Sequence, residues 1–336
     1  MRSNTQPRGF SLVELLVVIG IISLLIAIAL PAFSKAKESA RIATTTATIN
    51  TIGTGLEMFR ADERLGGQYP PSDRTELPHN PHLPDGVGKN KRLPGVLGAN
   101  LVVYALAGAD LLGSAGIRNA NGLPAGGSTP DWADDLSQQS SPPGLYRYTE
   151  RGLPAVARTS FVDVSKMKFP NATSDSTPSF KMPTWEDSLP SVVFLDSFDQ
   201  PILYYRANPG QMSIACYSKD PNNPRTPKGI YNMADNENLT GARWKGTSVP
   251  GMDFGAGKDH FPYKGDNLSP STLTLLKDPS TRDACKGTFA HTIYNPNVAT
   301  PGIFMPHNAE TFILLSAGPD GLFGTEDDIA NFPTNK

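Results

Sequence analysis

The pattern of apolar and polar positions changes abruptly near the start of the chain. From Phe10 to Leu30 most residues are apolar, and Glu14 is the only charged one. The run is close to the roughly 20 residues that a helix needs to cross the hydrocarbon core of a bilayer. A polar segment with Arg2 and Arg8 precedes it. The pattern predicts a membrane-spanning helix.

A second apolar pattern continues this helix beyond the apolar run. Pro31 removes one backbone hydrogen bond and predicts a kink rather than an end, because helical spacing resumes after it. We expect one helix from Phe10 to about Arg60, whose second half packs against a head as an ordinary core stripe and binds no cofactor. The apolar positions of that stripe are Ile42, Ile49, Ile52, Leu56 and Phe59.

Further along the chain, runs of β-branched and aromatic residues predict short strands. The best second helix is 93–112, and stretches rich in glycine and proline predict long loops between the elements. A long helix on an antiparallel sheet predicts an α+β fold. The strand candidates are 161–164, 191–195, 201–206, 212–217 and 311–316.

Composition supports a loop-rich head rather than a helical bundle. The chain has 31 Gly and 31 Pro, and only 18% of its residues are charged. Its net charge of -2 gives no general reason to expect nucleic-acid binding. Its length allows two domains or one helix with an elaborated head. The predicted segments are a leader 1–9, a membrane helix 10–30, its amphipathic continuation 31–62, a loop-rich insertion 63–190 and a β-sheet head 191–336.

Two features distinguish the amino-terminal segment from a secretory signal peptide. The small residue Gly9 precedes the apolar run, so cleavage after it would keep the helix. Cleavage there would also create a charged amine on Phe10, four residues from Glu14. A carboxylate inside lipid is costly unless it is paired. In a packed assembly of identical helices, Glu14 of one subunit would meet the Phe10 amine of its neighbour and offset the desolvation of both.

The segment Gly9-Phe10-Ser11-Leu12-Val13-Glu14-Leu15, followed by an apolar helix and Pro31, resembles the class III signal of type IV pilins and type II secretion pseudopilins. The resemblance implies that a prepilin peptidase cuts after Gly9 and that Phe10 becomes the N-methylated first residue. It also implies that Glu14 is the glutamate used in assembly. A simple N-terminal anchor and an uncleaved signal peptide are the alternatives, and a plain anchor gives no reason for Glu14.

The carboxyl end carries a cluster of acids after an apolar run. Glycines between them allow sharp turns, and carboxylates are the hard oxygen ligands that calcium prefers. Without a cation the charges would repel one another, and the alternative is a solvated acidic turn. The acids are Asp320, Glu326, Asp327 and Asp328.

The spacing of these acids is similar to the calcium loop of major type II pseudopilins. The resemblance implies that Asp320, Asp327 and Asp328 give side-chain oxygens to Ca²⁺, and it assigns no role to Glu326. Carbonyl groups such as those of Ala317, Leu322 and Gly324 would complete the shell. More loosely, Asp196 to Tyr205 resembles the Asp-Pro-Trp-Gly-Asn-Pro segment of those proteins, of which Asp196, Pro201 and the tyrosines remain.

The remaining reactive residues give little support for catalysis. Cys216 and Cys285 are the only cysteines, and they form either one disulfide or two unpaired buried thiols. His79 and His82 fall among prolines and are expected to be exposed loop residues. The chain has no GxSxG, HExxH or phosphate-loop motif. We therefore expect no enzyme.

Together these features predict a membrane-anchored, prepilin-like subunit. Arg2 and Arg8 place the amino terminus in the cytoplasm and the head beyond the inner membrane. The resemblance implies a structural role in a type II secretion pseudopilus, with prepilin peptidase, other pilin-like subunits and an inner-membrane assembly platform as partners. The alternatives are a minor type IV pilin for adhesion or DNA uptake, and a displayed binding or enzymatic domain. Major pseudopilins have shorter heads, which favours a tip or accessory position.

Overall fold

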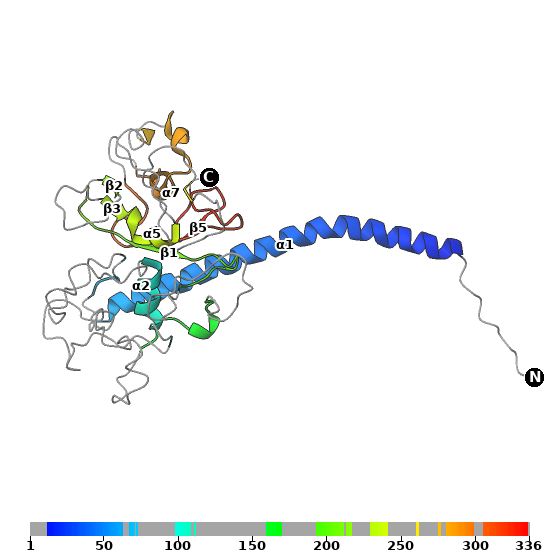
Figure 1. Cartoon of the computed structure of the whole chain (residues 1–336), viewed down its shortest axis with the longest axis horizontal. Helices are drawn as coiled ribbons and strands as arrows, with labels where there is room; N and C mark the ends of the chain where they lie inside the picture. The colour runs from blue at the N-terminus through cyan, green and yellow to red at the C-terminus, as the bar shows by residue number, and fades with distance from the viewer. Residues whose placement is uncertain are drawn as a thin grey trace, which may run out of the picture. The chain divides into compact units, whose positions relative to one another are not determined.

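Helix α1 is the longest element of the computed structural model and runs without a break over Leu12–Ala61 (Figure 1). Pro31 lies inside it and does not end it. The hydroxyls of Ser23 and Ser34 donate to carbonyl groups four residues earlier, at 2.7 and 3.2 Å. The predicted helix to about Arg60 is confirmed from Leu12 onward.

The chain forms two compact units, Met1–Ala43 and Thr44–Lys336, and helix α1 contributes residues to both. The residues that the structure describes are 12–62, 67–70, 72, 98–108, 111, 159–169, 193–211, 213–216, 229–240, 260–261, 275–276, 280–298, 305–334.

In the first unit, every side chain of α1 from Leu12 to Ala40 is exposed. The exposed residues include a long series of large apolar side chains, from Leu12 to Phe33. By length and composition this helix is able to cross a membrane. Ile42, predicted to be part of the core stripe, is exposed instead, so the buried face begins later.

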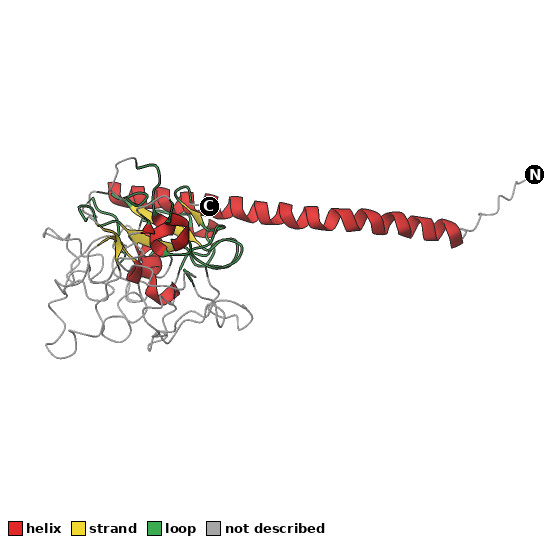
Figure 2. Ribbon diagram, turned by 90° about the horizontal axis from the view of Figure 1, so that it is seen from above, coloured by secondary structure: helices red, strands yellow, loops and turns green. Residues whose placement is uncertain are grey.

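In the second unit, one face of α1 is buried at helical spacing. Its apolar side chains pack with Tyr204 and Leu314 of the neighbouring sheet, and Figure 2 shows the strands beside this part of the helix. Gly55 belongs to the same face, where a Cβ atom would lie only 2.7 Å from Val162 Cγ1. The buried positions are Thr45, Ile49, Ile52, Gly55, Leu56 and Phe59.

The main sheet is antiparallel and three-stranded, in the order β1 (Leu203–Arg206), β4 (Phe312–Ser316), β5 (Ile329–Ala330). Leu203 pairs with Leu315, and Ser316 pairs with Ile329. Both faces of the sheet are buried, which explains the continuous apolar runs of β1 and β4. One face packs on α1, and the opposite face forms a second core.

Helix α2 (Gly98–Ala107) lies within the predicted helix 93–112 and packs beside β1. It ends earlier than predicted, because Gly108 and Leu111 have positive φ, at 78° and 61°. Gly98 permits this approach, because a Cβ atom there would lie 2.3 Å from the Tyr204 carbonyl oxygen. Asn236 joins the two elements: its Oδ1 accepts from the Ala99 amide at 2.9 Å, and its Nδ2 donates to the Tyr204 carbonyl at 2.7 Å.

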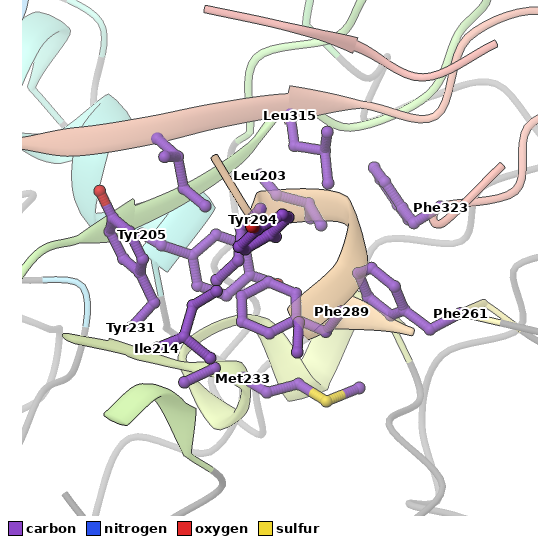
Figure 3. Close-up of a cluster of buried hydrophobic side chains, with 14 of the residues drawn as sticks. Leu203, Tyr205, Ile214, Tyr231, Met233, Phe261, Phe289, Tyr294, Leu315 and Phe323 are labelled. Carbon is purple, nitrogen blue, oxygen red and sulfur yellow. The ribbon is translucent and has the colours of Figure 1, made fainter. Parts of the chain in front are cut away.

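The second core lies on the face of the sheet that carries Leu203 and Leu315. It includes a parallel strand pair, β2 (Ser213–Cys216) and β3 (Gly229–Asn232), and the short helix α7 (Phe289–Ile293). Aromatic rings fill this core (Figure 3), with Phe289 against Tyr205 at 5.0 Å between ring centroids. Further short helices in the described part of the chain are η4 (Met233–Asn236), α5 (Glu237–Thr240) and η5 (Arg282–Cys285).

Two predicted strands are wrong. Residues 161–164 are not a strand, because the Asp163 side chain accepts the Ser165 amide and starts the 3₁₀ helix η3 (Val164–Lys166). Residues 193–195 form only isolated bridges, in which Leu195 pairs with Lys168 and Pro201. Strands β3 and β5 were not predicted, and the β2–β3 pair is parallel.

Candidate functional site

The loop after β4 contains the predicted calcium ligands, and three glycines shape it. Gly318, Gly321 and Gly324 all have positive φ, at 62°, 71° and 91°. At Gly318 a Cβ atom would lie 2.2 Å from the Asp327 carbonyl oxygen. A glycine is therefore required at this position both for its backbone conformation and for the close approach of the two ends of the loop.

Each predicted carboxylate ligand accepts a backbone amide of the loop. Asp320 Oδ1 accepts from the Leu322 amide at 2.7 Å, and Asp327 Oδ2 accepts from the Asp320 amide at 2.9 Å. Asp328 Oδ2 accepts from the Gly324 amide at 2.8 Å. The three acids thus fold the loop upon itself, and among the described residues no three His, Cys, Asp or Glu side chains form a ready metal-binding group.

Asp328 differs from the other two acids because it is only 4% exposed. Within the described part of the chain, its Oδ1 atom is buried and has no hydrogen-bond partner. Burial raises the pKa of Asp328 to about 8, and the charges of Asp327 and Asp320 add to the increase. Burial also raises the pKa of Asp320, with a further contribution from Asp327. A cation would relieve this crowding of negative charge.

Glu326, to which the sequence pattern assigns no role, forms an ion pair with Lys286, with 3.8 Å between Oε1 and Nζ. Both side chains are exposed, so this ion pair contributes little stability. Lys286 is distant in sequence from the loop, so no local pattern predicts this ion pair.

A distant segment also fastens the loop. Phe261 donates its amide to the Phe323 carbonyl at 2.6 Å, and Phe323 donates its amide to His260 Nδ1 at 3.3 Å. The rings of Phe261 and Phe323 stack with 6.3 Å between their centroids (Figure 3). No local sequence pattern links His260 to Phe323, because the two residues are 63 positions apart.

Asp196, which belongs to the segment that loosely resembles a pseudopilin sequence, is 1% exposed. It contacts Ser316, the last residue of β4 before the loop. Its Oδ1 atom accepts the amides of Phe198 and Gln200 at 2.7 and 2.8 Å. Its Oδ2 atom accepts the Ser316 hydroxyl at 2.5 Å. Burial raises the pKa of Asp196, and these donors oppose the increase.

The structure has Cys216 and Cys285 as buried free thiols rather than as a disulfide. Cys285 belongs to the second core, and Cys216 is the buried last residue of β2. Burial raises the pKa of Cys216 to about 11 and also raises that of Cys285, so both thiols favour the protonated form. The Cys285 thiol donates to the Arg282 carbonyl at 2.9 Å.

The buried histidines His291 and His307 take part in packing and in local helix structure. His291 lies in α7, whose first turn is capped by the Thr288 hydroxyl oxygen, and His307 stacks on Phe332 with 4.6 Å between ring centroids. Burial lowers the pKa of both side chains, which favours the neutral form. His79 and His82 lie outside the described residues.

At the amino terminus, Gly9 and Phe10 lie outside the described residues. Glu14 is exposed in the first turn of α1, and Pro31 lies further along the same helix. Residues 5–30 match the model of the prokaryotic N-terminal methylation motif. The match spans Gly9, Phe10 and Glu14, so it includes every residue predicted for processing and assembly.

This prepilin-like motif supports a pilin-like subunit that is processed by prepilin peptidase and assembles with other pilins. Together with the apolar helix it fits membrane anchoring. The α+β fold, with its long apolar helix and antiparallel sheet, agrees with a pilin-like protein. Comparison with curated proteins and with solved structures gives no match.

Proposed function

We propose that this chain is a structural subunit of a type II secretion pseudopilus. The observation that carries the proposal is the methylation motif at residues 5–30, whose described part, from Leu12 to Leu30, lies on a helix with all of its apolar side chains exposed. Prepilin peptidase removes residues 1–9 and methylates Phe10. Helix α1 then leaves the bilayer by packing against copies of itself, and repeated contacts that do not close build a helical filament.

Glu14 guides that assembly. It is the one charged residue in the apolar part of α1, and in lipid its carboxylate is stabilised only by a partner. The methylated amine of Phe10 in a neighbouring subunit supplies the opposite charge. The pair neutralises both groups only when the two helices are in register, so it sets the axial offset between subunits.

The C-terminal loop is proposed to bind Ca²⁺ through Asp320, Asp327 and Asp328. The buried, unpartnered Oδ1 atom of Asp328 and the raised pKa values of Asp320 and Asp328 support a cation here. Carboxylate oxygens are the donors that calcium prefers. Bound calcium supplies positive charge that offsets the crowded carboxylates, and these residues then hold the loop against the end of β4.

The calcium loop favours the secretion system over other pilin-like systems, because its acid spacing resembles that of major pseudopilins. A minor type IV pilin is the second candidate. The length of the chain favours a tip or accessory position, since major pseudopilins have shorter heads. A displayed binding domain would need the anchor but not Glu14.

The test compares the full chain with Glu14→Ala and Glu38→Ala in cells of its own source. Both variants remove one exposed carboxylate from α1. We expect E14A to be processed and to remain in the membrane but to be absent from sheared filaments, whereas E38A is incorporated. Incorporation of E14A at the level of the unmodified chain would contradict the assembly role and favour simple display.

A further inference from the structure

A polar path joins the C-terminal loop to helix α1, and Asp196 lies at its centre. Asp196 starts the turn 196–200, which precedes β1. One carboxylate oxygen holds the turn by accepting the Phe198 and Gln200 amides at 2.7 and 2.8 Å. The other accepts the Ser316 hydroxyl at 2.5 Å. The two oxygens of a single side chain therefore serve two segments that are distant in sequence.

Ser316 connects Asp196 to the loop. It is the last residue of β4, and its hydroxyl donates a hydrogen bond to Asp196. The same hydroxyl oxygen accepts the Gly318 amide at 3.2 Å. Gly318 in turn packs its backbone against the Asp327 carbonyl. Because no side chain fits between Gly318 and Asp327, the position of Gly318 fixes the end of the loop that carries Asp327 and Asp328.

The other end of the path reaches helix α1. The Ser197 amide, next to Asp196, donates to Thr45 Oγ1 at 3.2 Å. Thr45 is fully buried on the same face of the helix as Ile49 and Ile52. Its hydroxyl gives this face a polar contact with the turn, and the apolar residues beyond it pack on the sheet.

The path has the properties of a rigid connection. Asp196, Ser316 and Thr45 are each 1% exposed or less. Water therefore competes poorly for their hydrogen bonds, and a buried polar network whose members are satisfied holds one geometry. Local opening of the turn must break the hydrogen bonds to Asp196 and to Thr45 together. A ligand that restrains one part of the path therefore makes local opening of the other parts less frequent.

We propose that Asp196 and Ser316 are positioning residues that couple the C-terminal loop to helix α1 at Thr45. The inference rests on the proposed calcium site. A cation that restrains Asp327 and Asp328 also restrains Gly318, Ser316 and the turn 196–200, and so tightens the turn against the helix. Coupling of this kind is reciprocal, so a change at Thr45 alters the affinity of the loop for the cation.

The first experiment measures amide hydrogen exchange in the full chain in detergent, with and without saturating CaCl₂. The variants are Ser316→Ala, which cuts the path, and Ser213→Ala, a matched control whose hydroxyl bonds to the Ala215 carbonyl. Calcium should slow exchange of the Phe198 and Gln200 amides by roughly tenfold in the unmodified chain and in S213A. In S316A it should slow only the loop amides of Leu322 and Gly324.

The outcomes separate the coupling from the calcium site. If calcium slows the loop amides of the unmodified chain but leaves the turn unchanged, the coupling is wrong and the calcium site stands. If calcium changes neither region, the site is wrong and the coupling is lost with it. If S316A shows no protected loop at any calcium concentration, Ser316 belongs to the site itself and the coupling is wrong.

The second experiment approaches the path from the helix and does not depend on Ser316. Thr45→Val keeps the shape of the side chain and removes the oxygen that accepts the Ser197 amide. Thr51→Val is the control, because its hydroxyl donates to the Ala47 carbonyl within the same helix. We expect T45V to weaken calcium binding about fivefold, and T51V to leave it unchanged. Equal calcium affinity in both variants would overturn the proposal.

Discussion

Gly318 is the residue on which the C-terminal loop depends most directly. Its φ of 62° disfavours every residue with a Cβ atom, and an added Cβ would lie 2.2 Å from the Asp327 carbonyl oxygen. The conformation alone costs about 1–2 kcal/mol for an alanine, and the clash adds to that.

We therefore expect Gly318→Ala to lower the free energy of unfolding by about 3 kcal/mol or more. Gly210→Ala is the control, because Gly210 has a φ of 88° with nothing within 4 Å of the added Cβ. Only the conformational cost of about 1–2 kcal/mol applies there. Chemical denaturation measures both values, and equal losses would mean that the contact with Asp327 is not tight.

His307 predicts a pH dependence of stability. Its pKa is lowered by burial, and within the described part of the chain its Nε2 atom has no partner. Below the ordinary pKa of about 6.5, the unfolded state binds a proton that the folded state binds less readily. The stability of the folded state therefore falls as the pH drops through this value.

The measurement compares the melting temperature of the unmodified chain with that of His307→Gln. The difference, unmodified minus variant, should fall as the pH is lowered from about 7.5 to about 5. Other titrating groups are common to both proteins and cancel in the difference. A difference that stays constant over this range would show that His307 takes up a proton equally well in both states.

Some residue roles were open to prediction and others were not. Asp320, Asp327 and Asp328 stand out because glycines and acids are close in sequence. The partner of Asp196 is not visible in the same way, because Ser316 lies 120 residues later, at the end of β4. The burial of the Asp328 Oδ1 atom likewise depends on packing that no local pattern describes.

Among the elements, α1 contains two glycines that differ in the space available for an added side chain. At Gly55 an added Cβ atom would lie 2.7 Å from Val162 Cγ1 and 3.0 Å from the Phe161 carbonyl oxygen. At Gly53 the nearest atom is the Phe312 ring at 3.9 Å, which is ordinary contact. Both residues lie in the same helix, so the gain in helix propensity is the same.

We expect Gly53→Ala to stabilise the head by about 0.5–1 kcal/mol through helix propensity. Gly55→Ala should destabilise it by about 1–3 kcal/mol, because the close contact forces the helix away from Val162. Thermal or chemical unfolding distinguishes the two. A stabilising G55A would show that segment 161–162 moves aside freely.

The sequence predicts those elements whose local pattern of apolar and polar residues is enough to specify them. Helix α1 follows from apolar spacing, and β1 and β4 follow from apolar runs buried on both faces. Strand β5 has only two residues, Ile329–Ala330, and follows directly on the acidic loop, so its pattern is too short to recognise. The parallel pairing of β2 with β3 depends on their separate packing in the second core.

At the scale of the whole molecule, calcium binding is expected to appear as stability of the folded head. Calcium at about 100 times its Kd would stabilise the folded state by about 2.7 kcal/mol. The full chain in detergent should therefore melt a few degrees higher in calcium, by differential scanning calorimetry.

Asp327→Ala should abolish the increase, because it removes a proposed ligand. Glu310→Ala is the control, since it removes an exposed acid outside the loop with the same change of charge. If calcium raises the melting temperature of D327A as much as that of E310A, the cation binds elsewhere.

The central claim is that the chain follows the prepilin route to a membrane-anchored, assembling subunit. Mass spectrometry of the mature amino terminus, on protein purified from its own membranes, tests it most directly. The account predicts a chain that begins with N-methylated Phe10 and retains the whole of α1. An intact Met1 would contradict it, because Gly9 would then be unprocessed and the Phe10 amine would not be available to Glu14.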